Sequence, residues 1–343
     1  MIRTIAKKPS RRKPFNKVRA KNITIITIGY IFRYALIISL AYMILYPLLR
    51  MFVNGITHPR ALGAVGGIWV PPMVSLDNFR VSFAVMDFWN ALFFTVRNVT
   101  IMMLLQVLNA AFAGYAFARL RFRGMGILFM FVLITFLVPT QVFMLQQRVL
   151  FQNFDVFGII AAIRGDSLNL LGSPTAMFVL SGTGMGIAGG LFIFIFRQFF
   201  RGLPKELEEA AYVDGAGFIR TFFTIVFPMA KPAFLTVGTL SFIWNYNDTH
   251  FPMLFNAGNN LYFSIRTQLL FVVQGGTTIV QNMIHHARVA GRIPHTLETF
   301  ETPVYDAAIR SVSTFVALLP LIILFIIIQK QFVQGVERSG IVG

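Results

Sequence analysis

The acidic residues of this chain are few, and they concentrate in one polar passage, residues 197–231. Asp and Glu total 13 in 343 residues, and four of them lie in this passage beside five basic residues. The carboxylates just after Pro204 favour the positive end of a helix dipole, and Gly215 suits the end of that helix because glycine tolerates left-handed backbone. Ala210 and Ala211 keep one face of the helix low, so a groove on another protein could approach it closely. The chemistry expected here is therefore protein contact.

A second helical run is expected from Phe218 to Phe227, where Pro228 would end it. The charges of the passage interrupt a chain that is otherwise 56% hydrophobic. We therefore predict two short helices with a bend, lying on a membrane surface.

A tryptophan stands beside amides and a carboxylate in a later apolar run, Trp244-Asn245-Tyr246-Asn247-Asp248. A carboxylate inside a membrane costs about 2.5–3.5 kcal/mol on insertion scales, so this segment should face the bundle interior or water. A flat apolar ring with paired hydrogen-bonding groups is what a sugar contact requires. The segment is predicted to line a substrate pathway. The alternative is that Asp248 lies near the outer surface, where it closes a gate or pairs with an arginine.

Glycines recur every four residues at Gly182, Gly186 and Gly190. They form small-x-x-x-small faces, which let two membrane helices approach closely. Helix packing is predicted for these three residues, with a hinge or the lining of a pathway as the alternative.

Three histidines, His285, His286 and His295, lie near Arg288 and Arg292 in the last outer loop. A metal site needs three or four converging ligands. No adjacent carboxylate completes such a set, so no metal site is predicted. The positive character of the loop would also suit an acidic saccharide.

Nucleotide and thiol chemistry are not expected in this chain. It contains no Gly-Lys pair, and hence no phosphate-binding loop of the form G-x-x-x-x-G-K-[ST]. It contains no cysteine, which excludes disulfides, thiolate metal sites and a cysteine nucleophile. We therefore expect no catalytic residue and no cofactor in this chain; if ATP drives its function, a separate subunit must hydrolyse it.

The elements that must position these residues are membrane spans, because apolar runs near 20 residues recur along the chain. We predict an all-α membrane protein with six transmembrane helices and a cytoplasmic loop between spans 4 and 5. Residues 54–90, which contain Pro71-Pro72, and residues 256–306 are expected as outer loops. The expected spans are 25–49, 91–117, 126–146 with a kink at Pro139, 176–196, 233–255 and 307–329.

The basic residues set the orientation. Nineteen of the 30, including all eight lysines, fall in the N-terminal tail, residues 118–124, the polar passage and residues 330–343. The positive-inside rule therefore puts both termini and the passage in the cytoplasm. Nine basic residues precede Asn22 and account for much of the net charge of +17 as an anchor for anionic headgroups, so no nucleic-acid binding is predicted. The expected division is a basic cytoplasmic tail (1–22), a first span with an outer loop (23–90), a core domain (91–335) and a cytoplasmic C-terminal tail (336–343).

The polar passage contains the spacing E-A-A-x3-G-x9-I-x-L-P, with Phe227 where leucine is usual. The residues that make it are Glu209, Ala210, Ala211, Gly215, Ile225 and Pro228. This spacing resembles the EAA loop of ABC importer permeases, and the flanking Asp214 and Ala216 match the form common in sugar permeases.

The likeness extends to A-x-A-x-Y-A-F-A-R at Ala111 to Arg119, to Phe122-Arg123-Gly124, and to Gln331-Phe332-Val333-Gln334-Gly335. These segments resemble sugar permeases of the maltose-system type, in particular the smaller permease, although the tail lacks their usual lysine. In that family the EAA loop is a coupling helix that sits in a cleft of a cytoplasmic ATPase subunit, so a bulky residue at Gly215 should uncouple ATP hydrolysis from uptake. The outer loops meet an external solute-binding protein.

The resemblance implies a permease subunit of an ATP-driven importer of a sugar or oligosaccharide, in a bacterial inner membrane. Its implied partners are a second and different permease chain, two ATPases that bind ATP and Mg, and a solute-binding protein. Two other functions stay open at this stage. A self-sufficient secondary carrier would show repeated halves and ion-binding carboxylates in mid-span, and a membrane-embedded enzyme acting on lipid-linked saccharides would need acidic or histidine clusters at the membrane face.

Overall fold

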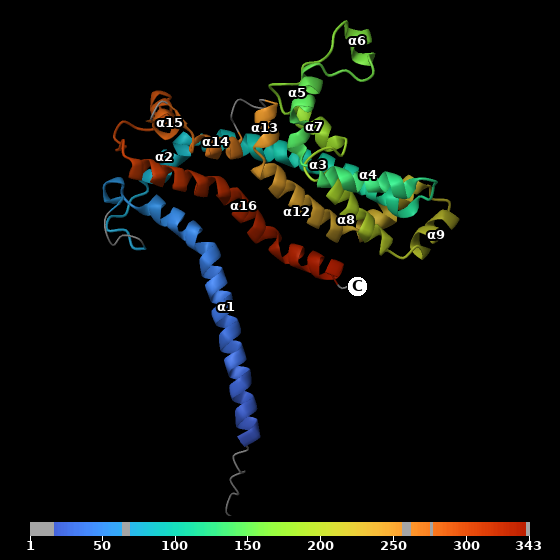
Figure 1. The fold of residues 1–343 in the computed structure, drawn as a ribbon, viewed down its shortest axis with the longest axis horizontal. Helices are drawn as coiled ribbons and strands as arrows, with labels where there is room; N and C mark the ends of the chain where they lie inside the picture. Colours follow the sequence, from blue (N-terminus) through green and yellow to red (C-terminus); the bar gives the residue numbers. More distant parts are fainter. Residues whose placement is uncertain (1–16, 64–68, 256–261, 275–276, 341–343) are drawn as a thin grey trace, which may run out of the picture.

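The computed structural model describes residues 17–63, 69–255, 262–274 and 277–340, and α-helices dominate these ranges. Within these ranges, three helices are long and apolar enough to cross a membrane: α1 (Lys17–Ile56), α3 (Phe88–Arg119) and α16 (Pro303–Gly340). The bundle is built around α3, while α1 runs away from it as a separate arm (Figure 1). Within the apolar stretch of each helix, 39% of α3 but only 6% of α1 is buried.

The buried side of α3 carries small and amide side chains, which let its neighbours approach closely. Helix α8 (Gly189–Arg201) packs against it, and a Cβ at Gly114 would lie 2.7 Å from the Cβ of Phe196 and 2.9 Å from the nitrogen of Arg197. Helix α12 (Lys231–Asn247) covers another part of the same side. Two clusters of buried apolar residues form around α3, one toward each of its ends.

The predicted third and fourth spans are broken in the structure. The third consists of α4 (Met125–Leu137), the 3-10 turn η2 (Thr140–Phe143) and α5 (Met144–Gln152), with the break at Pro139. The fourth consists of α7 (Thr175–Gly182) and α8, separated at residues 183–188. Helix α12 ends at Asn247, short of the predicted residue 255, and a separate α13 (His250–Leu254) follows.

Amide side chains of α3 satisfy the backbone at the break between α7 and α8. Gln106 donates to the carbonyl of Ile187 at 2.8 Å, and Asn109 donates to the carbonyl of Gly182 at 2.8 Å. The Gln106 amide oxygen also accepts from Ser241 and Asn245 of α12, at 2.6 and 3.0 Å. Because no water is available in a bilayer core, such contacts are what permit a broken helix at membrane depth.

The loops predicted to lie outside contain helices that are not expected from the sequence. Helix α2 (Asp77–Val85) lies in the predicted loop 54–90, after a 3-10 turn η1 (Pro59–Ala61), and α6 (Ile159–Arg164) lies between α5 and α7. The predicted loop 256–306 contains α14 (Phe263–Leu269), the two-residue strands β1 (Val273–Gln274) and β2 (Thr277–Thr278), and α15 (Ile279–Val289). Helix α2 packs against α1, α15 and α16.

The polar passage forms α9 (Glu206–Val213), α10 (Phe218–Thr221), the π-helical turn η3 (Phe222–Val226) and α11 (Phe227–Met229). Helices α10 to α11 and α12 together have the length of one span, bent by 80°. The structure thus contains three unbroken candidate spans within the described ranges, or four with this bent pair. The count of six spans stays a prediction, because the other two expected spans consist of short pieces.

Candidate functional site

Helix α9 presents most of its surface to the outside of the molecule. It lies at the end of the bundle opposite α2 and α15 (Figure 1). Glu209, Ala210 and Asp214 are exposed, and Val213 is 87% exposed. Ala211 is buried, so only one of the two alanines faces outward. This exposed surface, which we call the coupling surface, consists of Glu209, Ala210, Tyr212, Val213 and Asp214.

The rest of the predicted motif follows the coupling surface and supports it. Gly215 has left-handed backbone (φ 81°) and ends α9, while Ala216 and Ile225 are half-buried. The second helical run ends at Met229, one residue beyond the predicted end at Pro228. Helix α11 follows the π-helical turn η3 without a break, so Pro228 lies next to the end of one continuous helical path.

A buried ion pair joins α9 to the last turn of α3. The guanidinium of Arg119 donates to Glu208 Oε1 from Nε at 2.7 Å, and its Nη2 lies 2.6 Å from the same oxygen. Tyr115 donates its hydroxyl to Glu208 Oε2 at 3.0 Å, and Arg119 also donates to the carbonyl of Leu203 at 3.0 Å. We call Tyr115, Arg119 and Glu208 the inner tie.

Burial makes the inner tie costly to break. The side chains of Arg119 and Glu208 are 8% and 6% exposed. Removing one partner of such a pair leaves an uncompensated buried charge, which costs about 3–5 kcal/mol. Aromatic rings of Phe200, Phe218 and Phe222 surround Tyr115 and keep water away from the pair. Helix α9 is therefore held firmly to α3 while its other face stays open.

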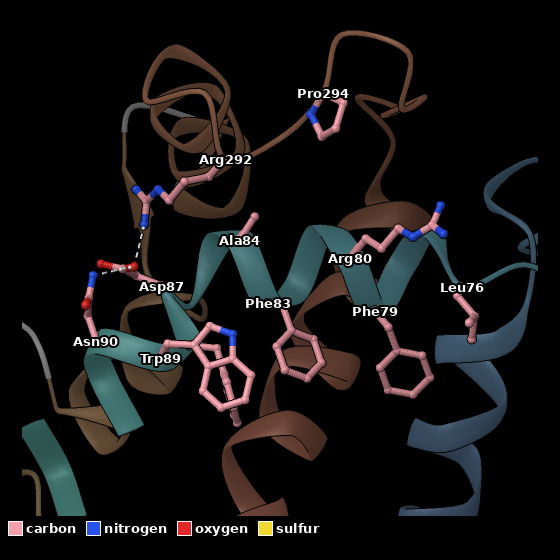
Figure 2. A pocket seen from close by; sticks show the side chains of 11 residues that line it. Leu76, Phe79, Arg80, Phe83, Ala84, Asp87, Trp89, Asn90, Arg292 and Pro294 are labelled. Carbon is pink, nitrogen blue, oxygen red and sulfur yellow. Dashed lines mark hydrogen bonds and ion pairs between the residues drawn. The ribbon is translucent and has the colours of Figure 1, made fainter. Parts of the chain in front are cut away.

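At the other end of α3, Asp87 makes a second and looser set of ion pairs. Its carboxylate lies 3.3 Å from Arg292 and 3.7 Å from Arg266, and it accepts from Asn90 at 3.1 Å. Figure 2 shows Arg292 reaching from the segment after α15 to Asp87, which also accepts a hydrogen bond from Asn90. We call Asp87, Arg266 and Arg292 the outer tie, because it fastens the long outer loop to the start of α3.

The outer tie is strained and partly open to solvent. Asp87 adopts left-handed backbone (φ 47°), which an L side chain rarely adopts and which is seen more often at functional sites. Burial lowers the pKa of Arg266, and the carboxylate of Asp87 opposes this effect. Arginine nevertheless stays charged at physiological pH. Arg292 and Asp87 are 36% and 23% exposed, so both still contact water.

A groove of about 820 Å³ runs along α2 beside the outer tie (Figure 2). Its apolar part consists of rings from α2 and the start of α3, among them Phe79, Phe83 and Trp89. Its polar part consists of Arg80, Asp87, Asn90 and Arg292. Figure 2 shows Phe79, Phe83 and Trp89 on one side of α2 and Arg292 and Pro294 on the other. Aromatic rings near amide, carboxylate and guanidinium groups are a common composition of a site for a polar organic molecule.

The segment predicted to line a pathway is divided between the core and the surface. Asn245 is buried in the Gln106 network, and Tyr246 donates its hydroxyl to the carbonyl of Ala317 at 2.7 Å. Trp244 is half-buried and stacks on Phe192, with ring centroids 5.6 Å apart. Asn247 is exposed, and Asp248 accepts from two backbone N–H groups that begin α13. Pathway lining stays a prediction for this segment, and the two buried residues hold helices together.

The three glycines do not form one helical face, because the break at residues 183–188 separates them. A Cβ at Gly190 would lie 2.4 Å from the carbonyl oxygen of Val132 in α4, and one at Gly186 would lie 2.5 Å from Gln106 Nε2. At Gly182 the nearest atom is 4.0 Å away. Gly190 thus lies at a close contact with α4, and Gly186 lies against the side chain of Gln106 in α3. At Gly182 there is room for a larger side chain.

Sequence reasoning missed both ties. Glu208 is read there only as a charge favouring the helix dipole, and Arg119 only as part of a basic cluster. The available signal was the i, i+4 spacing of Tyr115 and Arg119, which places both side chains on one side of the last turn of α3. Among the residues that the structure describes, no group of three His, Asp or Glu side chains converges as a metal site.

A protein-family model, the binding-protein-dependent transport system inner membrane component, matches residues 79–338. The arabinooligosaccharides transport system permease protein AraQ of Halalkalibacterium halodurans is 26% identical over 326 residues, covering 93% of this chain and 96% of the relative. The sn-glycerol-3-phosphate transport system permease protein UgpE of Escherichia coli K12 is 25% identical over 315 residues, covering 90% of this chain and 96% of the relative.

A solved structure has the same fold. It is a chain of a bacterial ABC transporter involved in the import of the acidic polysaccharide alginate, and it superposes with a TM-score of 0.61 at 19% sequence identity. The match covers 89% of this chain and 97% of that one. The matched family model begins within α2 and ends near the end of α16, so it contains the coupling surface and both ties.

Proposed function

Because this chain belongs to the family of binding-protein-dependent transport system inner membrane components, we propose that it is the permease subunit of an ATP-driven importer. The observation that carries this proposal is the coupling surface: an exposed helix face fixed to a membrane helix by a buried ion pair. A partner that moves α9 would move α3 with it. The cargo would pass from an external solute-binding protein to the cytoplasm by alternating access.

The proposed mechanism treats α3 as a rod with a fastening at each end. Two ATPase subunits, which bind ATP and Mg, would hold the coupling surfaces of two permeases and bring them together on closing. The inner tie would pass that motion to α3, and the outer tie would pass it to the outer loop and the groove beside it. The membrane helices would then rock from inward-facing to outward-facing.

The arm-like α1 supports a partner within the membrane. Its apolar surface has almost no contact with its own chain, in contrast to α3. A second permease subunit, which we propose is a different chain, would share this surface with lipid. Both termini and the coupling surface would lie in the cytoplasm, in keeping with the distribution of basic residues, and the membrane would be the bacterial inner membrane.

We propose a sugar or oligosaccharide as the cargo, supported by the names of several relatives. AraQ is named as a transport permease for arabinooligosaccharides, and another relative, MelC of Bacillus subtilis, is named as an import permease for melibiose, raffinose and stachyose. UgpE is named for sn-glycerol-3-phosphate, so relatives that are similarly identical to this chain differ in cargo.

Co-purification tests the proposal directly. The chain expressed with its partner subunits should bring down an ATPase, and ATP hydrolysis in proteoliposomes should rise with a loaded solute-binding protein. Glu209→Arg together with Gly215→Val should abolish both, because the first reverses a charge on the coupling surface and the second strains left-handed backbone at the end of α9. A double variant that retains the ATPase and its stimulation would contradict the proposed role of α9.

The same experiment decides between the proposal and its two alternatives. A secondary carrier would take up its cargo in proteoliposomes without any ATPase, driven by an ion gradient. A membrane enzyme acting on lipid-linked saccharides would turn over such a lipid with this chain alone. Neither activity would depend on Glu209.

A further inference from the structure

Arg97 is a cation on the open side of α3, within a helix that is long and apolar enough to span the membrane. It lies nine residues after Phe88, or about 13 Å along the helix axis at 1.5 Å per residue. Among the described residues no carboxylate lies within 4.0 Å of its guanidinium. Charged residues at membrane depth are costly, and they usually face a water-filled cavity and mark a substrate or ion pathway.

The guanidinium is held in place by its own helix. Its Nε and Nη2 both donate to Asn98 Oδ1 at 3.3 Å, and its carbon lies 5.7 and 5.4 Å from the ring centroids of Phe93 and Phe94. Asn98 is itself buried. A guanidinium has five N–H donors, so two hydrogen bonds to one amide oxygen leave donors available for an anion.

Two exposed aromatic residues connect Arg97 to the outer groove. Trp89 and Phe93 precede Arg97 at intervals of four residues, which places the three side chains on one side of α3. Trp89 is 73% exposed and Phe93 is 68% exposed. Trp89 also lines the groove along α2, where Figure 2 shows it beside Asn90 and Phe83. An aromatic path therefore leads from the groove to Arg97.

The charge along this path is positive. The groove is lined by Arg80 and Arg292, and its one lining carboxylate, Asp87, already pairs with two arginines. Aromatic rings offer flat apolar faces to sugar rings, and arginine offers paired donors to a carboxylate. A neutral sugar would leave the charge of Arg97 without a counterpart at membrane depth.

We propose that the groove beside α2 and the stripe Trp89, Phe93 and Arg97 form a binding site for an acidic saccharide, with Arg97 receiving its carboxylate. This inference rests on the proposed transport function and specifies the substrate class. The rings of Trp89 and Phe93 carry the sugar, and Arg97 recognises the charge. The other source of an anion at this depth is a lipid phosphate, which the experiment below separates from a sugar carboxylate.

The first measurement compares saccharides on the complete transporter in proteoliposomes, with its solute-binding protein. An oligouronate and the neutral oligosaccharide of the same length and linkage are tested for stimulation of ATP hydrolysis. We expect the oligouronate to stimulate, and Arg97→Gln to raise its half-saturating concentration by on the order of tenfold or more, because a hydrogen bond to a charged group is lost. Arg97→Lys should keep part of the effect, and Leu104→Gln, an exposed position further along the same side, should change little.

The second measurement uses the absence of cysteine from the chain. Arg97→Cys in the same proteoliposomes is treated with a membrane-impermeant, charged thiol reagent, with and without oligouronate. A position in a water-filled pathway should react, and the oligouronate should slow the reaction. Failure to react would mean that position 97 faces lipid and that its natural anion is a phosphate headgroup, which overturns the proposal.

The outcomes also separate this inference from the transport function. Stimulation by the neutral oligosaccharide alone, or equal stimulation by both that Arg97→Gln leaves unchanged, would overturn the acidic-saccharide site while the transport proposal stands. Loss of the ATPase from the wild-type complex would instead contradict the transport proposal. Stimulation by neither saccharide would overturn the substrate class proposed here.

Discussion

Both ends of α3 carry an ion pair between a carboxylate and arginine, and the two pairs differ in how deeply they are buried. At the inner end a single carboxylate, Glu208, is buried with Arg119 at 2.6–2.7 Å. At the outer end Asp87 shares its charge between Arg266 and Arg292 at 3.3–3.7 Å, with 23% of its side chain exposed. A buried pair is stiff because breaking it leaves a bare charge, whereas a half-exposed pair can exchange its partner for water. In the mechanism that we propose, the inner tie would transmit force and the outer tie would open and close.

The largest effect on stability is expected when Glu208 of the inner tie is removed. Glu208→Ala leaves Arg119 buried without a counter-charge, and we expect a loss of about 3–5 kcal/mol in the free energy of unfolding. Thermal unfolding of the purified chain in lipid nanodiscs, together with hydrogen exchange across α9, measures the effect. The double variant Arg119→Met/Glu208→Leu should recover much of the loss, because neither charge remains. A loss below about 1 kcal/mol in Glu208→Ala would show that the inner tie is not a buried pair.

The corresponding change at the outer end should cost much less. Asp87→Asn removes the charge but keeps a residue that tolerates left-handed backbone. We expect a loss of about 1–2 kcal/mol, because Arg292 is 36% exposed and can be hydrated, whereas Arg266 is only 14% exposed. The same unfolding measurement provides the comparison. A loss equal to that of Glu208→Ala would remove the distinction between the two ties.

Salt should separate the ties without any mutation. Raising the ionic strength from about 0.1 to 1 M shortens the Debye length from about 10 to 3 Å, which weakens exposed pairs more than buried ones. Hydrogen exchange should therefore speed up around Arg292 while exchange in α9 stays nearly constant. Equal acceleration at both ends would contradict the difference in burial.

The smallest effect on stability is expected at Glu209, the neighbour of Glu208. Glu209 is exposed, so Glu209→Ala should change the free energy of unfolding by about 0.5 kcal/mol or less. The same variant should nevertheless weaken recovery of the ATPase during co-purification. Of the two adjacent glutamates, Glu208 would then hold α9 to α3 and Glu209 would contact the partner. A large loss of stability in Glu209→Ala would contradict this division of roles.

Much of the fold follows from local pattern. The apolar runs of α1, α3 and α16 are long enough that hydropathy alone places them. The end of α9 follows from Gly215, because a left-handed residue is cheapest as glycine. Pro228 shows the precision of such rules, since the helical path that begins at Phe218 runs one residue past it.

The contacts within the candidate sites were harder to predict from the sequence than the helices. Glu208 and Glu209 are identical residues in adjacent positions, and no periodicity tells which of them meets Arg119, 89 residues earlier in the chain. Asn245 and Tyr246 look like pathway residues because they are polar in an apolar run, but their partners are Gln106 and a carbonyl of α16. Such partners are set by how helices pack, which involves residues distant in sequence.

The order of residues by itself determined that this chain lies in a membrane, which parts are polar, and where the helix before Gly215 ends, because composition, charge bias and helix-end chemistry are local properties. Only the tertiary structure decided which carboxylate is buried, which arginine stays open on α3, and how α2 and the segment after α15 enclose a groove. Those features depend on side chains from separate helices meeting at distances of a few ångströms, and no rule of spacing along one helix specifies such meetings.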